Sequence, residues 1–189
     1  MGAALVLLGC DKLSPAPPPF KGIDITGAEY ARTLSLTDQF GKARSLEEFK
    51  GKVSVVFFGY TQCPDVCPAT LAELAQIKKS LGKDGERVQG VFVTLDPKRD
   101  TQEVLKAYMA NFDPSFVALS GTPEQIKAAA REFKVFFQIS PGKTETSYTV
   151  DHTAGSFVFD ARGKVRLFVR YGSGADALSA DLKALLAQG

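Results

Sequence analysis

The chain has 189 residues, of which 44% are hydrophobic and 23% are charged, and its formal net charge at pH 7 is +2. This length suffices for one domain with a full hydrophobic core plus extra segments, and the absence of long basic runs argues against nucleic acid as a partner. Three cysteines are too few for a disulfide-stapled scaffold, and the single histidine excludes a metal site built from several histidines of one chain.

Residues 1–10, MGAALVLLGC, are apolar but too short to span a bilayer. We interpret them as the end of a secretory signal whose last four residues resemble a bacterial lipobox, in which Cys10 is lipidated. No lysine or arginine precedes the apolar run, so an upstream start or a buried strand stays open. Residues 11–22 contain the run SPAPPP and predict an extended tether, or simply a disordered tail.

The first half of the remaining chain predicts a hairpin followed by a strand and a helix. Alternating leucines before a turn at residues 38–41 indicate a short strand and hairpin, and residues 46–49 indicate one helical turn. The continuous apolar run at residues 53–59 is typical of a strand buried on both faces. Leucines and an isoleucine at helical spacing then predict a helix over residues 64–81.

The second half repeats this alternation and ends with a hairpin and a helix. We expect a parallel strand through residues 91–95, helices opening at Asp100-Thr-Gln-Glu103 and Thr122-Pro-Glu-Gln125, and a short strand at 116–119. Further strands are predicted at 147–150, 155–160 and 164–171, before a closing helix that contains residues 178–186. This order predicts one three-layer α/β domain with a central mixed sheet over residues 23–189.

Cys63 and Cys67 lie where the buried strand ends and the first helix begins. If both belong to the helix, their four-residue spacing places them on one face, close enough to bind one ion or to form a disulfide. The positive end of the helix dipole would favour their thiolate forms. The alternative is a pair of buried structural thiols.

His152 is the one imidazole available to complete a metal site. Two thiolates alone leave zinc short of its usual four ligands, whereas they suit Cu(I), and an added imidazole also allows Cu(II). A lone histidine is more often structural, but His152 lies at a break between two predicted strands, where ligands of open α/β sheets gather.

A second polar cluster follows the next strand. Asp96 is a candidate for holding the loop beside the metal without binding it, through hydrogen bonds from loop amides, although an Asp-Pro pair is also ordinary turn chemistry. Arg99 is available to meet an anionic partner surface. We interpret Asp100 as a helix cap.

Three segments together resemble the Sco (SenC) family of copper chaperones: Gly59-Tyr-Thr-Gln-Cys-Pro-Asp-Val-Cys-Pro68, Asp96-Pro-Lys-Arg-Asp-Thr101 and Val150-Asp-His-Thr153. Their order and approximate spacing match across nearly all of residues 28–187. The resemblance implies a thioredoxin-like fold and one copper ion, Cu(I) or Cu(II), held by Cys63, Cys67 and His152. It also implies delivery of copper to the binuclear site of a respiratory cytochrome oxidase, outside the cytoplasm. A lipidated Cys10 would replace the usual membrane tether and hold the protein on the periplasmic side of a bacterial inner membrane.

The main rival is a thiol-disulfide oxidoreductase that reduces a partner's copper-ligand cysteines, so the sequence leaves open whether the protein is an enzyme. Thioredoxins have two residues between their cysteines and a proline facing them, whereas this chain has three residues and His152. A peroxidase lacks support because no Pro-x-x-x-Thr-x-x-Cys pattern ends at Cys63. A non-catalytic assembly or copper-sensing protein remains a third class.

Overall fold

The computed structural model describes residues 20–144 and 147–189. The predicted signal segment, Cys10 and residues 11–19 of the predicted tether therefore lie outside the described residues.

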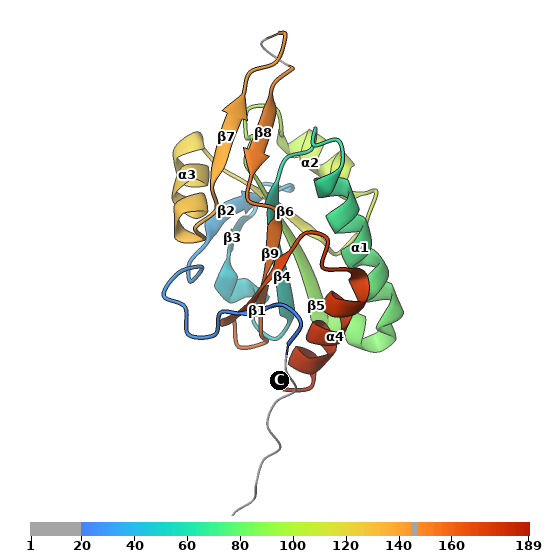
Figure 1. Ribbon diagram of the computed structural model, residues 1–189. Coiled ribbons are helices and arrows are strands. Elements are labelled where there is room, and N and C mark those ends of the chain that lie inside the picture. Colours follow the sequence, from blue (N-terminus) through green and yellow to red (C-terminus); the bar gives the residue numbers. More distant parts are fainter. Residues whose placement is uncertain (1–19, 145–146) are drawn as a thin grey trace, which may run out of the picture.

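A mixed sheet of eight strands forms the centre of the domain (Figure 1). Within it, β4 pairs in parallel with β5 and antiparallel with β9, and β5 pairs in parallel with β6. β4 and β5 are buried along their whole length, and for β4 this is what its continuous apolar run predicts. In spatial order the strands are β1 (Ile23–Asp24), β10 (Val165–Arg170), β9 (Gly155–Phe159), β4 (Val53–Gly59), β5 (Val88–Thr94), β6 (Val117–Ser120), β2 (Ser35–Asp38) and β3 (Ala43–Ser45).

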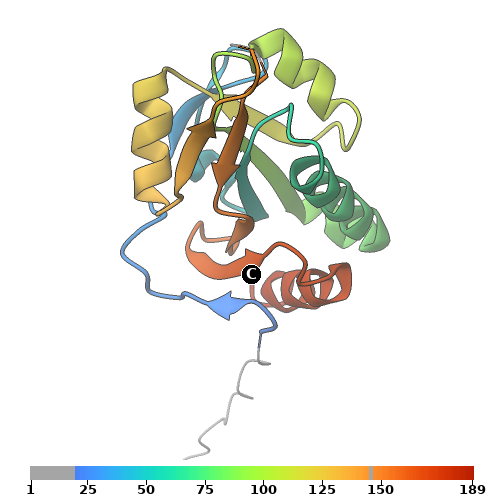
Figure 2. The same ribbon diagram turned by 45° about the horizontal axis from the view of Figure 1, so that its top comes forward.

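Helices cover both faces of the sheet and complete the three predicted layers. Successive residues of β4 point to opposite faces: the Phe57 ring lies 6.1 Å from Phe92 on the face of α1, and Phe58 lies 5.0 Å from Phe133 at the end of α3. Figure 2 shows α3 on one side of the sheet and α1 and α4 on the other. The helices are η1 (Leu46–Phe49), α1 (Val66–Ser80), η2 (Gly82–Arg87), α2 (Gln102–Met109), α3 (Pro123–Glu132) and α4 (Ala175–Leu186).

A two-stranded arm, made of β7 (Phe137–Ser140) and β8 (Thr149–His152), projects from the top of the domain in Figure 1. We did not predict β7, and β8 begins and ends two residues later than predicted. The arm matters because His152, its last residue, pairs with Phe137 at the base of β7. The histidine therefore belongs to a strand end and not to a free loop.

The chain enters the domain at the opposite end from this arm (Figure 1). There the carboxylate of Asp181, which is buried in α4, accepts hydrogen bonds of 2.7 Å from the backbone amides of both Lys21 and Gly22. These two residues, which we assigned to the tether, are thus fastened to the folded domain.

Most predicted elements agree with the structure, and two helix starts do not. The capping box at Thr122 is present, with Pro123 in the first turn of α3. However, α1 begins at Val66 and not at residue 64. Asp100 does not cap α2 either: Thr101 is the N-cap, and its side chain accepts from the amide of Val104.

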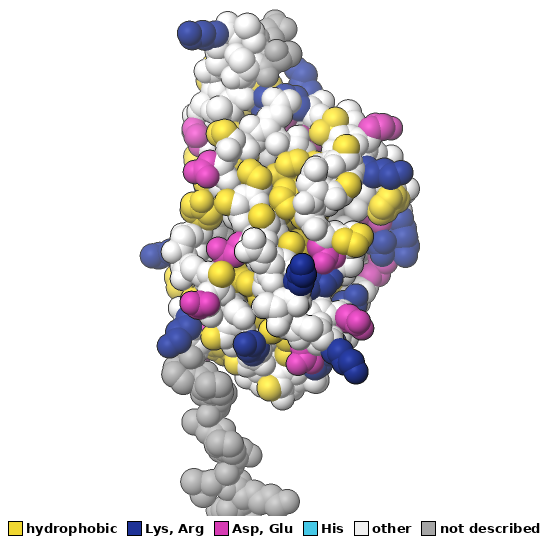
Figure 3. All heavy atoms as spheres, turned by 90° about the vertical axis from the view of Figure 1, so that its right-hand side faces the viewer, with side chains coloured by type: hydrophobic (Ala, Val, Ile, Leu, Met, Phe, Trp, Pro, Cys, Tyr) yellow, Lys and Arg dark blue, Asp and Glu magenta, His cyan; other side chains and the backbone are white. Residues whose placement is uncertain are grey.

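On the face covered by α1 and α4, positive and negative side chains are intermixed around a central group of apolar ones (Figure 3). Within the described ranges, no helix combines the length and apolar character needed to cross a membrane.

Candidate metal centre

The structure brings Cys63, Cys67 and His152 together at the end of the central sheet. Cys63 lies in the loop after β4, Cys67 is the second residue of α1, and His152 ends β8. Their candidate ligand atoms all lie within 4.8 Å of one another, and Cys67 Sγ is 3.8 Å from His152 Nε2. In the described part of the chain, this is the one group of three or more His, Cys, Asp and Glu side chains with such spacing.

The two thiols converge without sharing a helical turn, contrary to our expectation. Asp65, the N-cap of α1, has φ −141° and ψ −72°, so the helix cannot extend back to Cys63. Pro64 also disfavours helical geometry at Cys63, because its ring crowds the preceding residue. A turn, in which the Cys63 amide donates to the Tyr60 carbonyl at 3.2 Å, brings Cys63 back toward α1 instead.

Cys67 is fully buried, and this reverses our expectation of a lowered thiol pKa. Burial raises the pKa of Cys67 well above its ordinary value, because a thiolate loses more hydration than a thiol does. A hydrogen bond from the Tyr60 backbone opposes this rise without cancelling it. In the metal-free protein Cys67 is therefore a neutral thiol at pH 7, and Cys63 is the more accessible of the two.

The ring of His152 is oriented for ligation by its Nε2 atom. His152 Nδ1 lies 3.0 Å from the carbonyl oxygen of Thr153, which can only accept, so Nδ1 carries the proton of the neutral ring. Nε2 then presents its lone pair toward Cys67. Phe57 and Tyr60 pack edge-on against the ring at 6.1 and 6.3 Å and fix its plane. A fixed tautomer with an outward lone pair is what metal-binding histidines usually have.

The site opens to solvent through a pocket of about 310 Å³ lined by Cys63, Pro64, Val150 and His152, among others. Cys63 and His152 are partly exposed, whereas Cys67 is fully buried and does not line the pocket. An ion bound here can therefore be approached by another protein from the side of Cys63 and His152.

Gly59, the last residue of β4, makes room for the buried thiol. A Cβ atom at this position would lie 2.7 Å from Cys67 Sγ and 2.9 Å from the ring of Phe57. Our sequence interpretation missed this role, although the glycine four residues before Cys63 was a visible signal.

Asp96 and Asp100 support the surrounding loops: within the described residues, their carboxylates bond to neighbouring side chains and not to the three candidate ligands. Asp100 accepts from Thr61 Oγ1 at 2.6 Å and from Thr94 Oγ1 at 2.5 Å. Burial raises the pKa of Asp100, against these hydrogen bonds, which lower it. The Asp96 carboxylate accepts from the Tyr148 hydroxyl and the Arg99 side chain, whereas the loop amides of Arg99 and Asp100 donate to the Asp96 backbone carbonyl.

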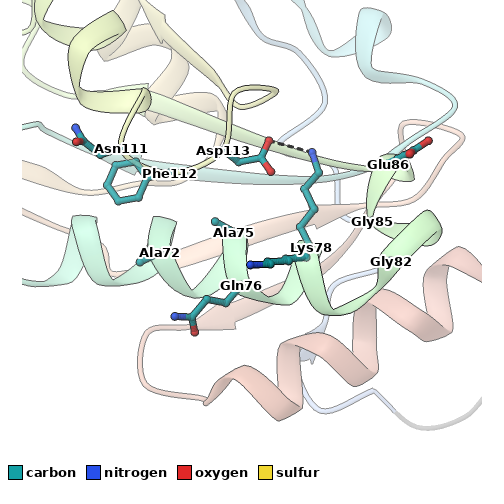
Figure 4. A pocket seen from close by; sticks show the side chains of 11 residues that line it. Ala72, Ala75, Gln76, Lys78, Gly82, Gly85, Glu86, Asn111, Phe112 and Asp113 are labelled. Atoms are coloured by element: carbon teal, nitrogen blue, oxygen red, sulfur yellow. Dashed lines mark hydrogen bonds and ion pairs between the residues drawn. The ribbon is translucent and has the colours of Figure 1, made fainter.

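A larger groove, of about 560 Å³, lies away from this site between α1, η2 and the loop after α2 (Figure 4). Lys78 reaches across it to Asp113, with its amino group 3.2 Å from the carboxylate. No thiol or imidazole lines the groove, so volume alone does not mark the reactive centre.

Comparison with known proteins agrees with the sequence motifs. A model of the SCO1/SenC family matches residues 24–187. A SCO2-like protein of Rickettsia felis is 40% identical over 132 residues, which are 69% of this chain and 64% of that relative. The chain thus spans under two thirds of that relative's length.

Two solved structures are similar throughout the domain. ScoI of Bradyrhizobium japonicum, determined with copper bound, is 38% identical with a TM-score of 0.74, covering 81% of this chain and 97% of that one. Apo Sco1 of Thermus thermophilus is 39% identical with a TM-score of 0.78, covering 88% and 97%. The predicted α/β, thioredoxin-like fold is thereby confirmed, and this chain belongs to the SCO1/SenC family.

Proposed function

We propose that this protein is a copper metallochaperone that binds one copper ion through Cys63, Cys67 and His152. The observation that carries the proposal is the convergence of two sulfurs and one imidazole nitrogen within 4.8 Å. Thiolates favour Cu(I), and the added imidazole accommodates Cu(II). The copper-bound relative from Bradyrhizobium japonicum supports this choice of metal.

The second part of the proposal is delivery of the copper to the binuclear copper site of a respiratory cytochrome oxidase subunit. Three ligands leave room at the ion for a donor from an acceptor, and the partly exposed Cys63 and His152 allow that acceptor to replace ligands one at a time. We further propose that lipidation of Cys10 and a tether that follows it hold the domain on the periplasmic side of the inner membrane, with the predicted tether of residues 11–22 shortened by Lys21 and Gly22, which bond to the domain.

A transfer experiment tests delivery. The copper-loaded protein is mixed with the soluble copper-binding domain of a cytochrome oxidase subunit, and the metal content of each is measured after separation. We expect copper to move to the acceptor faster than from a small copper-thiolate complex at the same free copper concentration. Equal rates would contradict a chaperone role while leaving copper binding intact.

One observation favours a thiol-disulfide oxidoreductase as the second candidate. Cys63 is partly exposed and Cys67 is buried beside it, which is the arrangement of an attacking thiol and a resolving thiol. The Cys63 thiolate would attack a partner disulfide, and Cys67 would then release the reduced partner by forming the Cys63–Cys67 disulfide. That oxidised form cannot hold copper through thiolates, so the two activities exclude each other at any one moment.

Copper binding should weaken as the pH falls. Because its pKa is raised, Cys67 is protonated in the metal-free protein throughout the range from pH 6 to 8, and binding must displace that proton. Each decrease of one pH unit should therefore lower the apparent affinity for copper by about tenfold or more. Competition titrations at three pH values measure this slope. A pH-independent affinity would contradict ligation by the Cys67 thiolate.

The substitution Gly59→Ala should weaken copper binding by roughly tenfold, the usual scale for changes that displace a metal ligand. The new methyl group overlaps Cys67 Sγ and forces the sulfur away from His152. Gly90→Ala is the matched control, because its Cβ would lie 2.7 Å from the Phe116 ring, away from the thiols. Both variants should lose about 1–3 kcal/mol of stability by overpacking, and only Gly59→Ala should lose affinity. Equal affinities in the two variants would contradict this role of Gly59.

A further inference from the structure

Arg99 connects the two segments that carry the candidate ligands. Its guanidinium group donates from Nη1 to the side chain of Gln62 at 3.1 Å and to the backbone carbonyl of Tyr148 at 2.8 Å. Gln62 directly precedes Cys63, and Tyr148 directly precedes β8, which ends at His152. One side chain thus bonds to Gln62 and to Tyr148, which are 86 residues apart in the chain.

The guanidinium plane is fixed from several sides. It stacks on the ring of Tyr148, with Cζ 3.5 Å from the ring centroid, and lies 5.6 Å from the centroid of Tyr60. Asp96 pairs with Nε of Arg99, and its other carboxylate oxygen accepts from the Tyr148 hydroxyl at 2.7 Å. The side chains of Arg99 and Asp96 are only 10% and 4% exposed, so water competes little for these bonds.

The planar, branched donor set of arginine makes this arrangement possible. Lysine presents a single nitrogen and cannot donate along these separate directions while it stacks flat on an aromatic ring. Desolvation and the bond to Asp96 raise the pKa of Tyr148 to about 12, which keeps its hydroxyl a donor at neutral pH. The expectation that Arg99 faces an outside partner is therefore replaced by an internal role.

We propose that Arg99, braced by Asp96 and Tyr148, is a positioning residue that holds His152 at the distance from the two thiols that the metal site requires. The arm formed by β7 and β8 pairs with itself and not with the eight-stranded sheet. Arg99 bonds to the Tyr148 carbonyl directly before β8, and His152 ends the same short strand. This inference rests on the proposed copper site for its functional meaning, but its structural part concerns the metal-free protein.

The test compares Arg99→Ala, Arg99→Lys and a control, Arg162→Ala, which removes a 73% exposed arginine from the turn between β9 and β10. We expect Arg99→Ala to weaken Cu(II) binding by about tenfold to a hundredfold, the usual effect of losing a group that orients a metal ligand. Cu(I), which the two thiolates can hold alone, should weaken less than about threefold. Arg99→Lys should recover little of the Cu(II) affinity, and the control should match the unmodified protein.

A second measurement needs no copper. Amide hydrogen exchange in the metal-free protein should accelerate at residues 148–152 in Arg99→Ala while the protection of β4 and β5 is unchanged. Equal losses of Cu(I) and Cu(II) affinity, or unchanged exchange at residues 148–152, would overturn the inference. If the unmodified protein binds no copper, the proposed function fails, and the exchange data alone then decide whether Arg99 positions His152.

Discussion

Stoichiometric copper binding should be abolished when Cys63 and Cys67 are both replaced by alanine. The double variant retains His152 alone from the candidate site, and one imidazole on a protein surface binds copper only weakly. We expect the affinity to fall by at least on the order of a thousandfold, since metal affinity here depends on converged, deprotonated thiols. Equilibrium dialysis with a copper competitor measures the loss.

The design must separate ligand loss from unfolding. Cys67 is fully buried, so its truncation leaves a small cavity worth about 1 kcal/mol, whereas Cys63 is partly exposed and its truncation should be nearly neutral. Both single variants should therefore lose most of their copper affinity while differing in stability. The experiments use a Cys10→Ser background so that the third thiol of the chain cannot substitute. Full stoichiometric binding by the folded double variant would refute the proposed site.

The second large effect is expected for His152→Ala. Removing the imidazole should lower Cu(II) affinity by about a hundredfold or more, while Cu(I) remains on the two thiolates and disulfide exchange through the same sulfurs continues. Competition titrations with each copper oxidation state measure the Cu(I) and Cu(II) affinities of this variant, and a disulfide-reduction assay measures its rate of disulfide exchange.

His152→Phe is the matched control for packing. It keeps a ring of similar size between Phe57 and Tyr60 but has no nitrogen. If His152 acts by binding the ion, His152→Ala and His152→Phe should lose equal amounts of Cu(II) affinity. If His152→Phe retained Cu(II) affinity, the histidine would act only by packing. A parallel loss of disulfide exchange would instead assign His152 to the redox chemistry of the rival function.

The sequence predicted the elements whose burial leaves a strong local pattern. The strand at β4 was placed correctly because an apolar run bounded by glycines is buried on both faces. The capping box of α3 was found because Thr122 and Gln125 bond to each other's backbone within one turn. β7 was missed because its alternation of apolar and polar residues, Phe137-Gln-Ile-Ser140, is only four residues long, and because it pairs with β8 and has no fully buried residue.

The site's composition was also visible in the sequence, but its geometry was not. Cys63 was expected in the helix, yet Pro64 and the non-helical Asp65 place it in a loop. Our prediction of a lowered thiol pKa was wrong for Cys67, because burial raises this pKa by more than the helix dipole can lower it. How deeply a thiol is buried depends on the packing of the sheet and helices, which the local sequence does not reveal. Asp100 was expected to cap α2, but Thr61, which lies 39 residues away, holds its carboxylate. Such partners are fixed by tertiary contact and leave no local signal.

The hydrogen bonds between Asp181 and the amides of Lys21 and Gly22 determine at which end of the domain the N-terminal segment joins it. They place the attachment point of everything N-terminal to Phe20 at the end of the domain opposite the β7–β8 arm (Figure 1). Under the anchoring through Cys10 that we propose, the domain would be held at that end, and its thiols would lie at the end that faces away from the anchor. The ten residues from Cys10 to Phe20 span at most about 35 Å, so the proposed anchor would lie within that distance of the end of the domain opposite the metal site.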